Sequence, residues 1–270
     1  TTRFENLGEV KNTGWEIMLM AQVIDGRSFG WDLALNGSLN SNELISLGGV
    51  PPGAGATSRN VEGYPLFGWW NHRFLGFEDK NGDGLIRYSA DPNLNEVFLG
   101  TEPEYLGPSL PTREFALTSG IDLFRRSLRL SGQLDYKGGH LLYNNTERIR
   151  CQSRNNCRGL IDPNAPLFEQ ARTIAVRQFG TAIGGGAFME KADFLRLREL
   201  SLSLRAPDRW AGLIGGRSLT TSLSVRNVAM LWTEYTGVDP EAMASTINNP
   251  SEFQAFGPPT YVSFRLTLGF

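Results

Sequence analysis

The sequence predicts an all-β protein: an antiparallel transmembrane β-barrel segment of about seven strands with long external loops. Three observations lead to this prediction. Apolar and polar residues alternate with period 2, the alternating stretches are longer than ordinary strands, and their connections alternate between short and long. Glycine is also frequent, with 31 residues among 270, and 14 prolines accompany it, which disfavours a mainly helical fold.

Each predicted strand has one apolar face and one polar face. The last strand shows this most clearly, because apolar residues occupy every second position from Val262 to Phe270. The other predicted strands cover residues 15–23, 31–39, 115–123, 128–136, 193–206 and 218–225. Within 193–206 the apolar side chains change face, so we expect a β-bulge near Glu199.

Strand length and loop length both point to a membrane. The strands run for about 10–15 residues, against five or six in most soluble sheets. A strand of about 12 residues, tilted by roughly 40°, rises about 30 Å, the thickness of a bilayer's hydrocarbon core. The short connections are 25–29, 125–127 and 207–216, and the long ones are 43–111, 138–191 and 229–258. This order places all long loops at one end, as in outer-membrane barrels, and a secreted β-sandwich is the alternative.

The alternation also assigns side chains to faces. We expect seven residues to face lipid: Ile17, Leu33, Leu35, Leu130, Leu223, Phe264 and Leu266. Six others should face the lumen: Glu16, Asp32, Asn36, Arg129, Ser224 and Arg265. Trp31, Trp210 and Phe270 fall near the short-turn end and Trp232 near the long-loop end, as expected for aromatic girdles at two interfaces.

Composition excludes several classes of protein. With 26 Lys+Arg against 28 Asp+Glu, the net charge of −2 gives no basic face for nucleic acid. Hydrophobic residues make up 40 % and charged residues 20 %, which excludes a disordered chain. Two cysteines are too few for a disulfide scaffold or a four-ligand zinc site, and two histidines are too few for a multi-histidine metallohydrolase. No Ser/His/carboxylate set with catalytic context emerges, so we expect no enzyme. The chain starts at Thr1 without a signal peptide, and we expect a processed product or a piece of something longer.

Four segments, in this order, carry a family resemblance. Residues 6–16 fit N-x-G-x-V-x-N-x-G-W-E, and residues 78–86 contain D-x-N-G-D-G-x-I. Residues 193–202 read D-F-L-R-L-R-E-L-S-L, and residues 226–241 end on T-E-Y-T-G-V-D-P-E. Through these segments the chain resembles the C-terminal barrel region of SusC/RagA-type TonB-dependent outer-membrane transporters.

The resemblance implies a barrel of about 22 strands, which seven strands cannot close. Residues 1–270 would then be the C-terminal part of the barrel, with the plug domain and the earlier strands absent. The implied function is TonB-dependent import of oligosaccharides or peptides together with a SusD-type surface lipoprotein. The implied location is the outer membrane of a Gram-negative, Bacteroidota-like cell, with lipids, TonB, the plug and the remaining strands as partners. The alternative is a non-transport scaffold or surface-interaction barrel.

One loop resembles half of a calcium-binding loop. Asp79, Asn81 and Asp83 place oxygens at positions 1, 3 and 5 of an EF-hand pattern, and Gly84 follows at position 6. Position 12, which should be glutamate, is Ala90. A Ca²⁺ site at this loop is the functional interpretation, and a polar turn closed by Asp and Asn side chains is the alternative.

Other candidate residues lie in the long loops and at the chain end. Cys151 and Cys157 should form a disulfide if their loop is external, and two free thiols are the alternative. Tyr64, Trp69 and Trp70 either stack on a sugar ring or peptide side chain, or hold the first long loop together. The glycine-rich stretches 51–58 and 180–186 read as flexible loop. By resemblance to outer-membrane barrels, Phe270 should be an assembly signal that closes a strand paired with residues 219–227.

Overall fold

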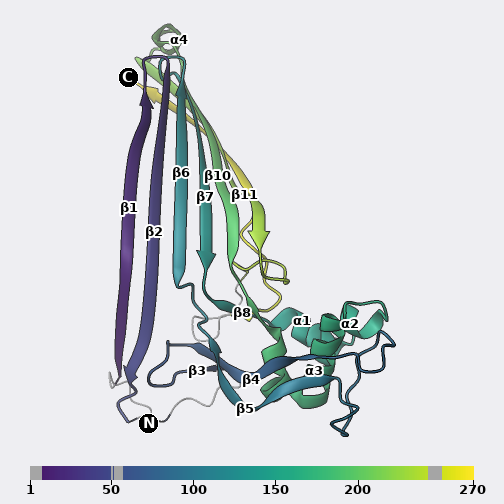
Figure 1. The fold of residues 1–270 in the computed structure, drawn as a ribbon. Helices are drawn as coiled ribbons and strands as arrows, with labels where there is room; N and C mark the ends of the chain where they lie inside the picture. Colours follow the sequence, from purple (N-terminus) through teal and green to yellow (C-terminus); the bar gives the residue numbers. More distant parts are fainter. Residues whose placement is uncertain (1–7, 50, 52–56, 243–250) are drawn as a thin grey trace, which may run out of the picture.

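The computed structural model describes residues 8–49, 51, 57–242 and 251–270. A seven-stranded antiparallel sheet forms its long body, and a smaller α/β region lies at one end of this sheet (Figure 1). The strands in spatial order are β1 (Glu9–Asp25), β2 (Phe29–Ser46), β6 (Arg113–Leu123), β7 (Leu128–Gly138), β10 (Phe194–Arg205), β11 (Ser218–Thr233) and β13 (Tyr261–Gly269). The prediction of a seven-strand antiparallel segment is confirmed.

The strand register separates the sheet into an apolar face and a polar face, because residues directly opposite each other share a face. One row on the apolar face comprises Trp31, Ile121, Leu130, Leu202, Leu223 and Phe264. The adjacent row on the polar face comprises Asp32, Gly120, Ser131, Ser201, Ser224 and Ser263. All seven residues predicted for the apolar face and all six predicted for the polar face lie on those faces.

Bulges or register shifts interrupt the sheet at four places: Glu9/Val10, Gln22/Ile24, Leu195/Arg196 and Leu197/Glu199. The pairing of β10 with both β7 and β11 shifts between Leu197 and Glu199, so Arg198 is the extra residue, and the predicted bulge is confirmed. A second bulge, which the sequence did not predict, lies between Gln22 and Ile24 of β1. Ile24, rather than Val23, therefore lies opposite Trp31 on the neighbouring strand.

The connections sort by length as predicted. The turns at 26–28, 124–127 and 206–217 lie at one end with the chain's C-terminus, and the last of them includes α4 (Asp208–Leu213), which carries Trp210 (Figure 1). The three long connections leave from the other end. Near that end Phe115, Tyr136 and Trp232 lie in one row of the apolar face, in agreement with the predicted aromatic residues at both ends.

Two of the long connections fold into structured elements that were not predicted, and we call residues 57–112 and 139–193 the loop domain. One small sheet contains β3 (Ser58–Arg59), β4 (Gly68–Phe77) and β5 (Val97–Gly107). Another joins β8 (Leu141–Asn144) and β9 (Met189–Lys191) to β12 (Ser251–Glu252), which belongs to the third long connection. The helical elements are α1 (Asn145–Ile149), η1 (Arg150–Arg154), α2 (Arg158–Ile161), α3 (Leu167–Gly184) and η2 (Gly185–Phe188).

The prediction of a flexible loop at 180–186 is wrong. Helix α3 continues to Gly184 with a kink at Gly180, whose φ of 68° suits glycine, and η2 follows directly. Residues 184–186 are buried against the loop-domain core, and a Cβ at Gly184 or Gly186 would overlap backbone atoms. Of the other glycine-rich stretch, residues 52–56 lie outside the described residues.

Replacing Gly186 by alanine should destabilise the loop domain by about 1–3 kcal/mol, because the added Cβ would overlap the carbonyl oxygen of His72. Hydrogen exchange of α3 measures the effect. Gly212→Ala is the matched control, because a Cβ there meets nothing within 4 Å. Equal exchange in the two variants would contradict this packing.

Candidate functional site

The polar face of the sheet carries a set of hydrogen-bonded charges. Arg129 of β7 pairs with Asp32 at 2.8 Å and with Asp122 at 3.0 Å, and thus links three strands. The hydroxyls of Ser131 and Ser201 lie 2.7 Å apart in the next row. This face therefore offers a hydrated, charged surface, whereas the opposite face offers almost none.

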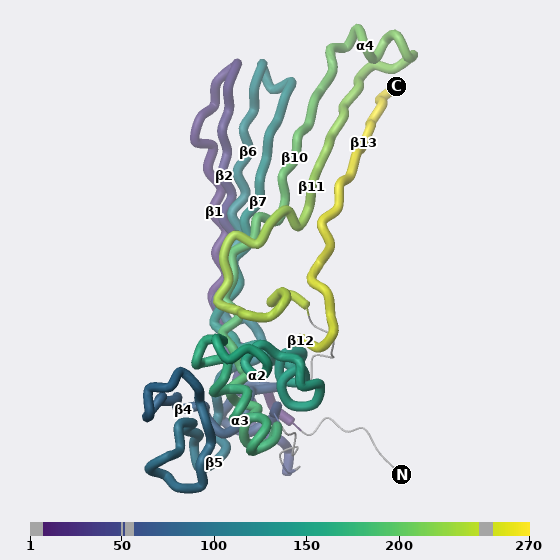
Figure 2. Tube along the Cα trace, turned by 90° about the vertical axis from the view of Figure 1, so that its right-hand side faces the viewer, coloured from purple at the N-terminus to yellow at the C-terminus, as the bar shows by residue number. Residues whose placement is uncertain are grey.

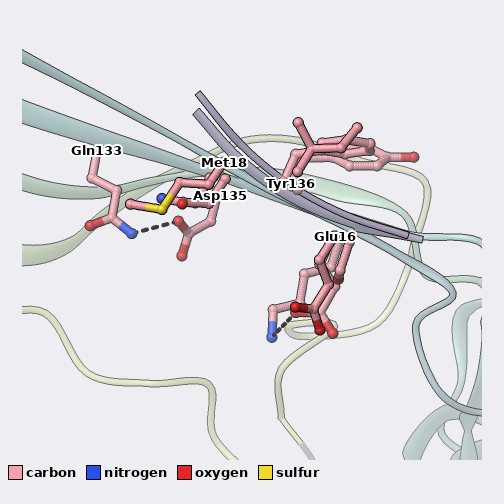
Figure 3. Close-up of a pocket in the computed structure, with 13 residues that line it drawn as sticks. Glu16, Met18, Gln133, Asp135 and Tyr136 are labelled. Carbon is pink, nitrogen blue, oxygen red and sulfur yellow. Dashed lines mark hydrogen bonds and ion pairs between the residues drawn. The ribbon is translucent and has the colours of Figure 1, made fainter. Parts of the chain in front are cut away.

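A recess of about 720 Å³ lies on this sheet towards the loop domain, among β1, β2, β6 and β7. Glu16, Glu114 and Asp135 contribute carboxylates, and Lys137 lies 3.3 Å from Glu114. Figure 3 shows Glu16 and Asp135 in the recess, with the Gln133 amide donating to Asp135 at 2.8 Å. The recess can bind a polar ligand through hydrogen bonds and charge, with carboxylates in excess.

Asp135 also connects the recess to a group that we call the arginine network: Arg196, Arg198, Asp135, Asp239 and Glu241. Arg196 donates to both oxygens of Asp239, at 2.7 and 2.6 Å, and its Nε lies 2.9 Å from Glu241 Oε2. Arg198 donates to Asp135 at 2.6 Å and to Glu241 at 2.9 Å. Paired, largely buried charges of this kind hold their segments in one arrangement.

The network joins two of the segments that carry the family resemblance, 193–202 and 226–241. Asn227 of β11, at φ 52°, also contacts this network: its side-chain oxygen accepts from Arg198 at 2.9 Å, and its amide donates to the carbonyl of Pro259 at 2.9 Å. Thus the loop between β11 and β13 is held near both of its ends. The sequence contained a signal for this network: Arg196 and Arg198 stand at alternate positions of one strand, and the acidic D-P-E segment follows the next strand.

A second buried polar cluster lies where the loop domain meets Tyr235, Thr236 and Glu252. Glu190 accepts from Arg172 at 2.8 Å and from both the backbone N–H and the hydroxyl of Thr236, at 2.9 and 2.7 Å. Glu252, only 1 % exposed, accepts from Tyr235 at 2.9 Å. Burial, reinforced by Glu252, raises the pKa of Tyr235 far above its usual value, so this hydroxyl stays a donor.

The predicted calcium residues form a turn in which their side-chain oxygens accept hydrogen bonds from the turn's own backbone N–H groups. Asp79 accepts from the backbone N–H groups of Gly82 and Gly84, both at 2.8 Å, and Asn81 from that of Asp83 at 3.0 Å. Arg87 pairs with Asp83, and this contact holds the pKa of the Asp83 carboxyl below its usual value. Because a guanidinium competes with a cation there, the arrangement fits the polar turn better, and calcium stays a prediction.

Cys151 and Cys157 are joined in a disulfide that lies in the loop-domain core, with both residues no more than 1 % exposed. Together with Glu147 they form the one group of His, Cys, Asp or Glu side chains, among the described residues, that is close enough to share an ion. Disulfide sulfurs are not thiolates, so this group does not provide a metal site while the bond is intact.

Replacing both cysteines by serine should cost the loop domain about 2–3 kcal/mol, the entropy expected for a cross-link across six positions. Guanidinium unfolding followed by tryptophan fluorescence measures the loss, since Trp69 lies in the same core. Because the sulfurs are buried, an impermeant thiol reagent should label them only when a reductant and partial unfolding are combined. Labelling of the native protein without reductant would contradict the bond.

The three aromatic residues predicted for ligand contact pack against other side chains of the loop domain. Trp69 is fully buried, and its indole N–H donates to the carbonyl of Leu141 at 2.8 Å, so it presents no surface to a ligand. Tyr64 and Trp70 pack with Tyr105, with ring centroids 4.9–5.8 Å apart. Only Tyr64 of the predicted three is exposed, at 38 %.

Phe270 follows directly after β13 and is 81 % exposed.

His140, between β7 and β8, should make the stability of the loop domain depend on pH. Burial, opposed by nearby Asp193, lowers the pKa of His140 to about 4 from 6.5. Below pH 6.5 only the unfolded chain takes up the proton, so stability falls as the pH drops from 6.5 to about 4, by about 3 kcal/mol in all. His140→Gln should flatten this dependence in unfolding curves measured at pH 7.5, 5.5 and 4.5; an unchanged slope would contradict it.

None of the helices in the described part of the chain is long and apolar enough to span a membrane.

No family profile matches the chain. Curated relatives include the TonB-dependent receptors P26 and P3 of Formosa agariphila, which are 24 % and 22 % identical over 269 and 278 residues. The TonB-dependent receptor SusC of Bacteroides thetaiotaomicron is 25 % identical over 267 residues. These alignments cover 89 %, 92 % and 91 % of this chain, but only 26 %, 27 % and 25 % of the relatives. The chain thus spans about a quarter of their length.

Solved structures with the same fold include one described as the RagAB peptide transporter, with a TM-score of 0.69 and 20 % identity. The RagAB peptide importer in the closed-closed state gives 0.68 and 21 %. They cover 99 % and 98 % of this chain and 30 % of each compared chain. The predicted resemblance to SusC/RagA-type transporters is confirmed, and the relatives are named as receptors and transporters, in agreement with the prediction of no enzyme.

Proposed function

We propose that this chain is part of the wall of a TonB-dependent outer-membrane importer, with its apolar face against lipid and its polar face towards the transport path. The observation that supports this best is the two-faced register, which extends across all seven strands despite the bulges. A sheet with one continuous apolar face and no core packed against it suits a bilayer, whose interior requires fully paired strands.

The remaining barrel strands are proposed partners at both edges. All 17 residues of β1 are exposed, and among the described strands β13 pairs with β11 alone, as expected for the predicted last strand. Each edge carries backbone groups that need partners in lipid, where an unpaired group costs several kcal/mol. We therefore assign residues 1–270 to the C-terminal part of a larger barrel that also holds a plug domain.

We propose oligopeptides, rather than neutral oligosaccharides, as the imported substrates. The recess on the polar face is lined by Glu16, Glu114, Asp135 and Lys137, which suit the charges of peptides. Neutral sugars are usually bound by flat aromatic surfaces, and the predicted aromatic residues Trp69 and Trp70 instead pack within the loop domain. A SusD-type lipoprotein would meet the loop domain, and TonB would act through segments upstream of this chain.

The test is uptake by cells that express the complete transporter, compared with a strain deleted for its gene. Both strains receive a tryptic digest of serum albumin or a maltooligosaccharide mixture, and mass spectrometry follows depletion of the medium. We expect gene-dependent loss of peptides that stops when TonB is deleted. Gene-dependent loss of the sugars instead would overturn the substrate class, and no gene-dependent loss of either would favour the scaffold alternative.

A further inference from the structure

We infer that residues 236–241 form a fixed strap across the polar face, inside the mouth of the barrel, and that Val238 at its centre is a specificity-determining contact for the substrate. The inference rests on the proposed function, because it assigns a role along the transport path. We call residues 236–241 the strap.

The strap lies on the polar face because it covers residues that point there. Arg196 lies opposite Asp135, and Phe194 opposite Lys137, both in rows of the polar face. Arg196 is only 4 % exposed and Phe194 only 1 %, whereas the Arg129 side chain on the uncovered part of the same face is 39 % exposed. Figure 2 shows the chain turning back across the neighbouring strands directly after β11. A segment that covers the inner face of a barrel wall lies within the barrel.

Both ends of the strap are anchored. At its start, Thr236 donates two hydrogen bonds to Glu190 of β9, at 2.9 and 2.7 Å. At its end, Asp239 accepts from Arg196 and Glu241 accepts from Arg198, and Pro240 between them is buried. Three bonded positions and the buried Pro240, within six residues, leave the strap little freedom to move aside for a substrate.

Val238 is the side chain that this arrangement presents. It is 68 % exposed, although its neighbours on both sides are tied to the sheet and the loop domain. Together with Thr236 and Gly237 it borders a polar cavity of about 350 Å³, whose other side includes Arg150 and Glu169. An exposed apolar side chain on an anchored backbone segment suits contact with a transported ligand, because the segment loses little conformational entropy when the ligand binds.

The experiment uses the complete transporter with Val238→Cys. The described residues contain no free cysteine. Once any free cysteine in the rest of the transporter is replaced by serine, the introduced thiol can be modified selectively with a bulky impermeant maleimide. Leu94→Cys is the matched control, because Leu94 is 65 % exposed in the loop domain, away from the strap. The readout is depletion of the albumin digest by cells, before and after modification, with gel-shift labelling to confirm that both thiols react.

We expect modification at position 238 to lower peptide uptake at least fivefold, most strongly for the longest peptides, while modification at position 94 leaves uptake within twofold of the unmodified cells. Equal effects at both positions, or no effect at 238 despite full labelling, would overturn the inference. Failure of the proposed function is distinguished because the unmodified parent would then show no gene-dependent uptake at all.

Discussion

Arg196→Ala should detach the loop between β11 and β13 from the polar face of the sheet. The Arg196 side chain is 5 % exposed and donates to both oxygens of Asp239, so its removal leaves Asp239 without its counter-charge, while Glu241 keeps only its pair with Arg198. Removing one partner of a buried pair costs about 3–5 kcal/mol, because the other partner stays desolvated. We expect hydrogen exchange across residues 234–242 to accelerate at least a hundredfold, with the exchange of β7 unchanged.

The control is another Arg–carboxylate pair of β10, which joins this strand to β11 and not to the loop. Arg226 lies 2.7 Å from Glu199, but their side chains are 52 % and 26 % exposed, and such pairs contribute about 0–1 kcal/mol. Glu199→Gln should therefore leave the exchange of the loop nearly unchanged. Similar exchange in Arg196→Ala and Glu199→Gln would mean that the arginine network does not hold the loop.

The sheet could be predicted from the sequence because its signal is local. Each strand contacts its neighbours through residues that alternate with period 2, so the pattern that fixes burial also identifies the strand. The bulge at Arg198 was predictable for the same reason, since one extra residue exchanges the faces of all residues beyond it. The bulge at Val23 left no such trace, because Val23 and Ile24 are both apolar.

The loop domain was missed for two reasons. Helix α3 has a helical pattern, with Ala171, Ala175 and Val176 buried, but its segment was interpreted only as a connection between strands. The glycine-rich pattern at 184–186 predicts a flexible loop, but in the structure the small size of these residues allows close packing. Composition alone does not distinguish these two uses of glycine.

The arginine network depends on contacts that no local pattern contains. Arg196 and Asp239 are 43 positions apart in the chain and meet only because the loop folds back onto the sheet. Conversely, the calcium prediction used a local motif and did not include Arg87, whose contact with Asp83 changes the chemistry of that motif. Local patterns therefore predicted the strands, while the functional surfaces depend on which loops return to which face.

Leu266→Arg tests the proposed side of the sheet that meets lipid. Leu266 of β13 lies opposite Thr221 on the apolar face and is 57 % exposed. In a bilayer an arginine there should cost about 2–4 kcal/mol near the midplane, because the charge loses its hydration. The measurement is urea unfolding of the transporter in liposomes, together with the amount of folded protein in outer membranes.

Thr267→Arg is the matched control, since Thr267 is the next residue of the same strand and lies opposite Thr220 on the polar face. An arginine there would enter the aqueous side beside the existing Arg265 and should change stability by less than about 1 kcal/mol. Both variants introduce the same residue at neighbouring positions of one strand. The difference between their stabilities therefore reports mainly the environment of each face. A larger cost for Thr267→Arg would reverse the assignment of the faces, and with it the position of the strap inside the barrel.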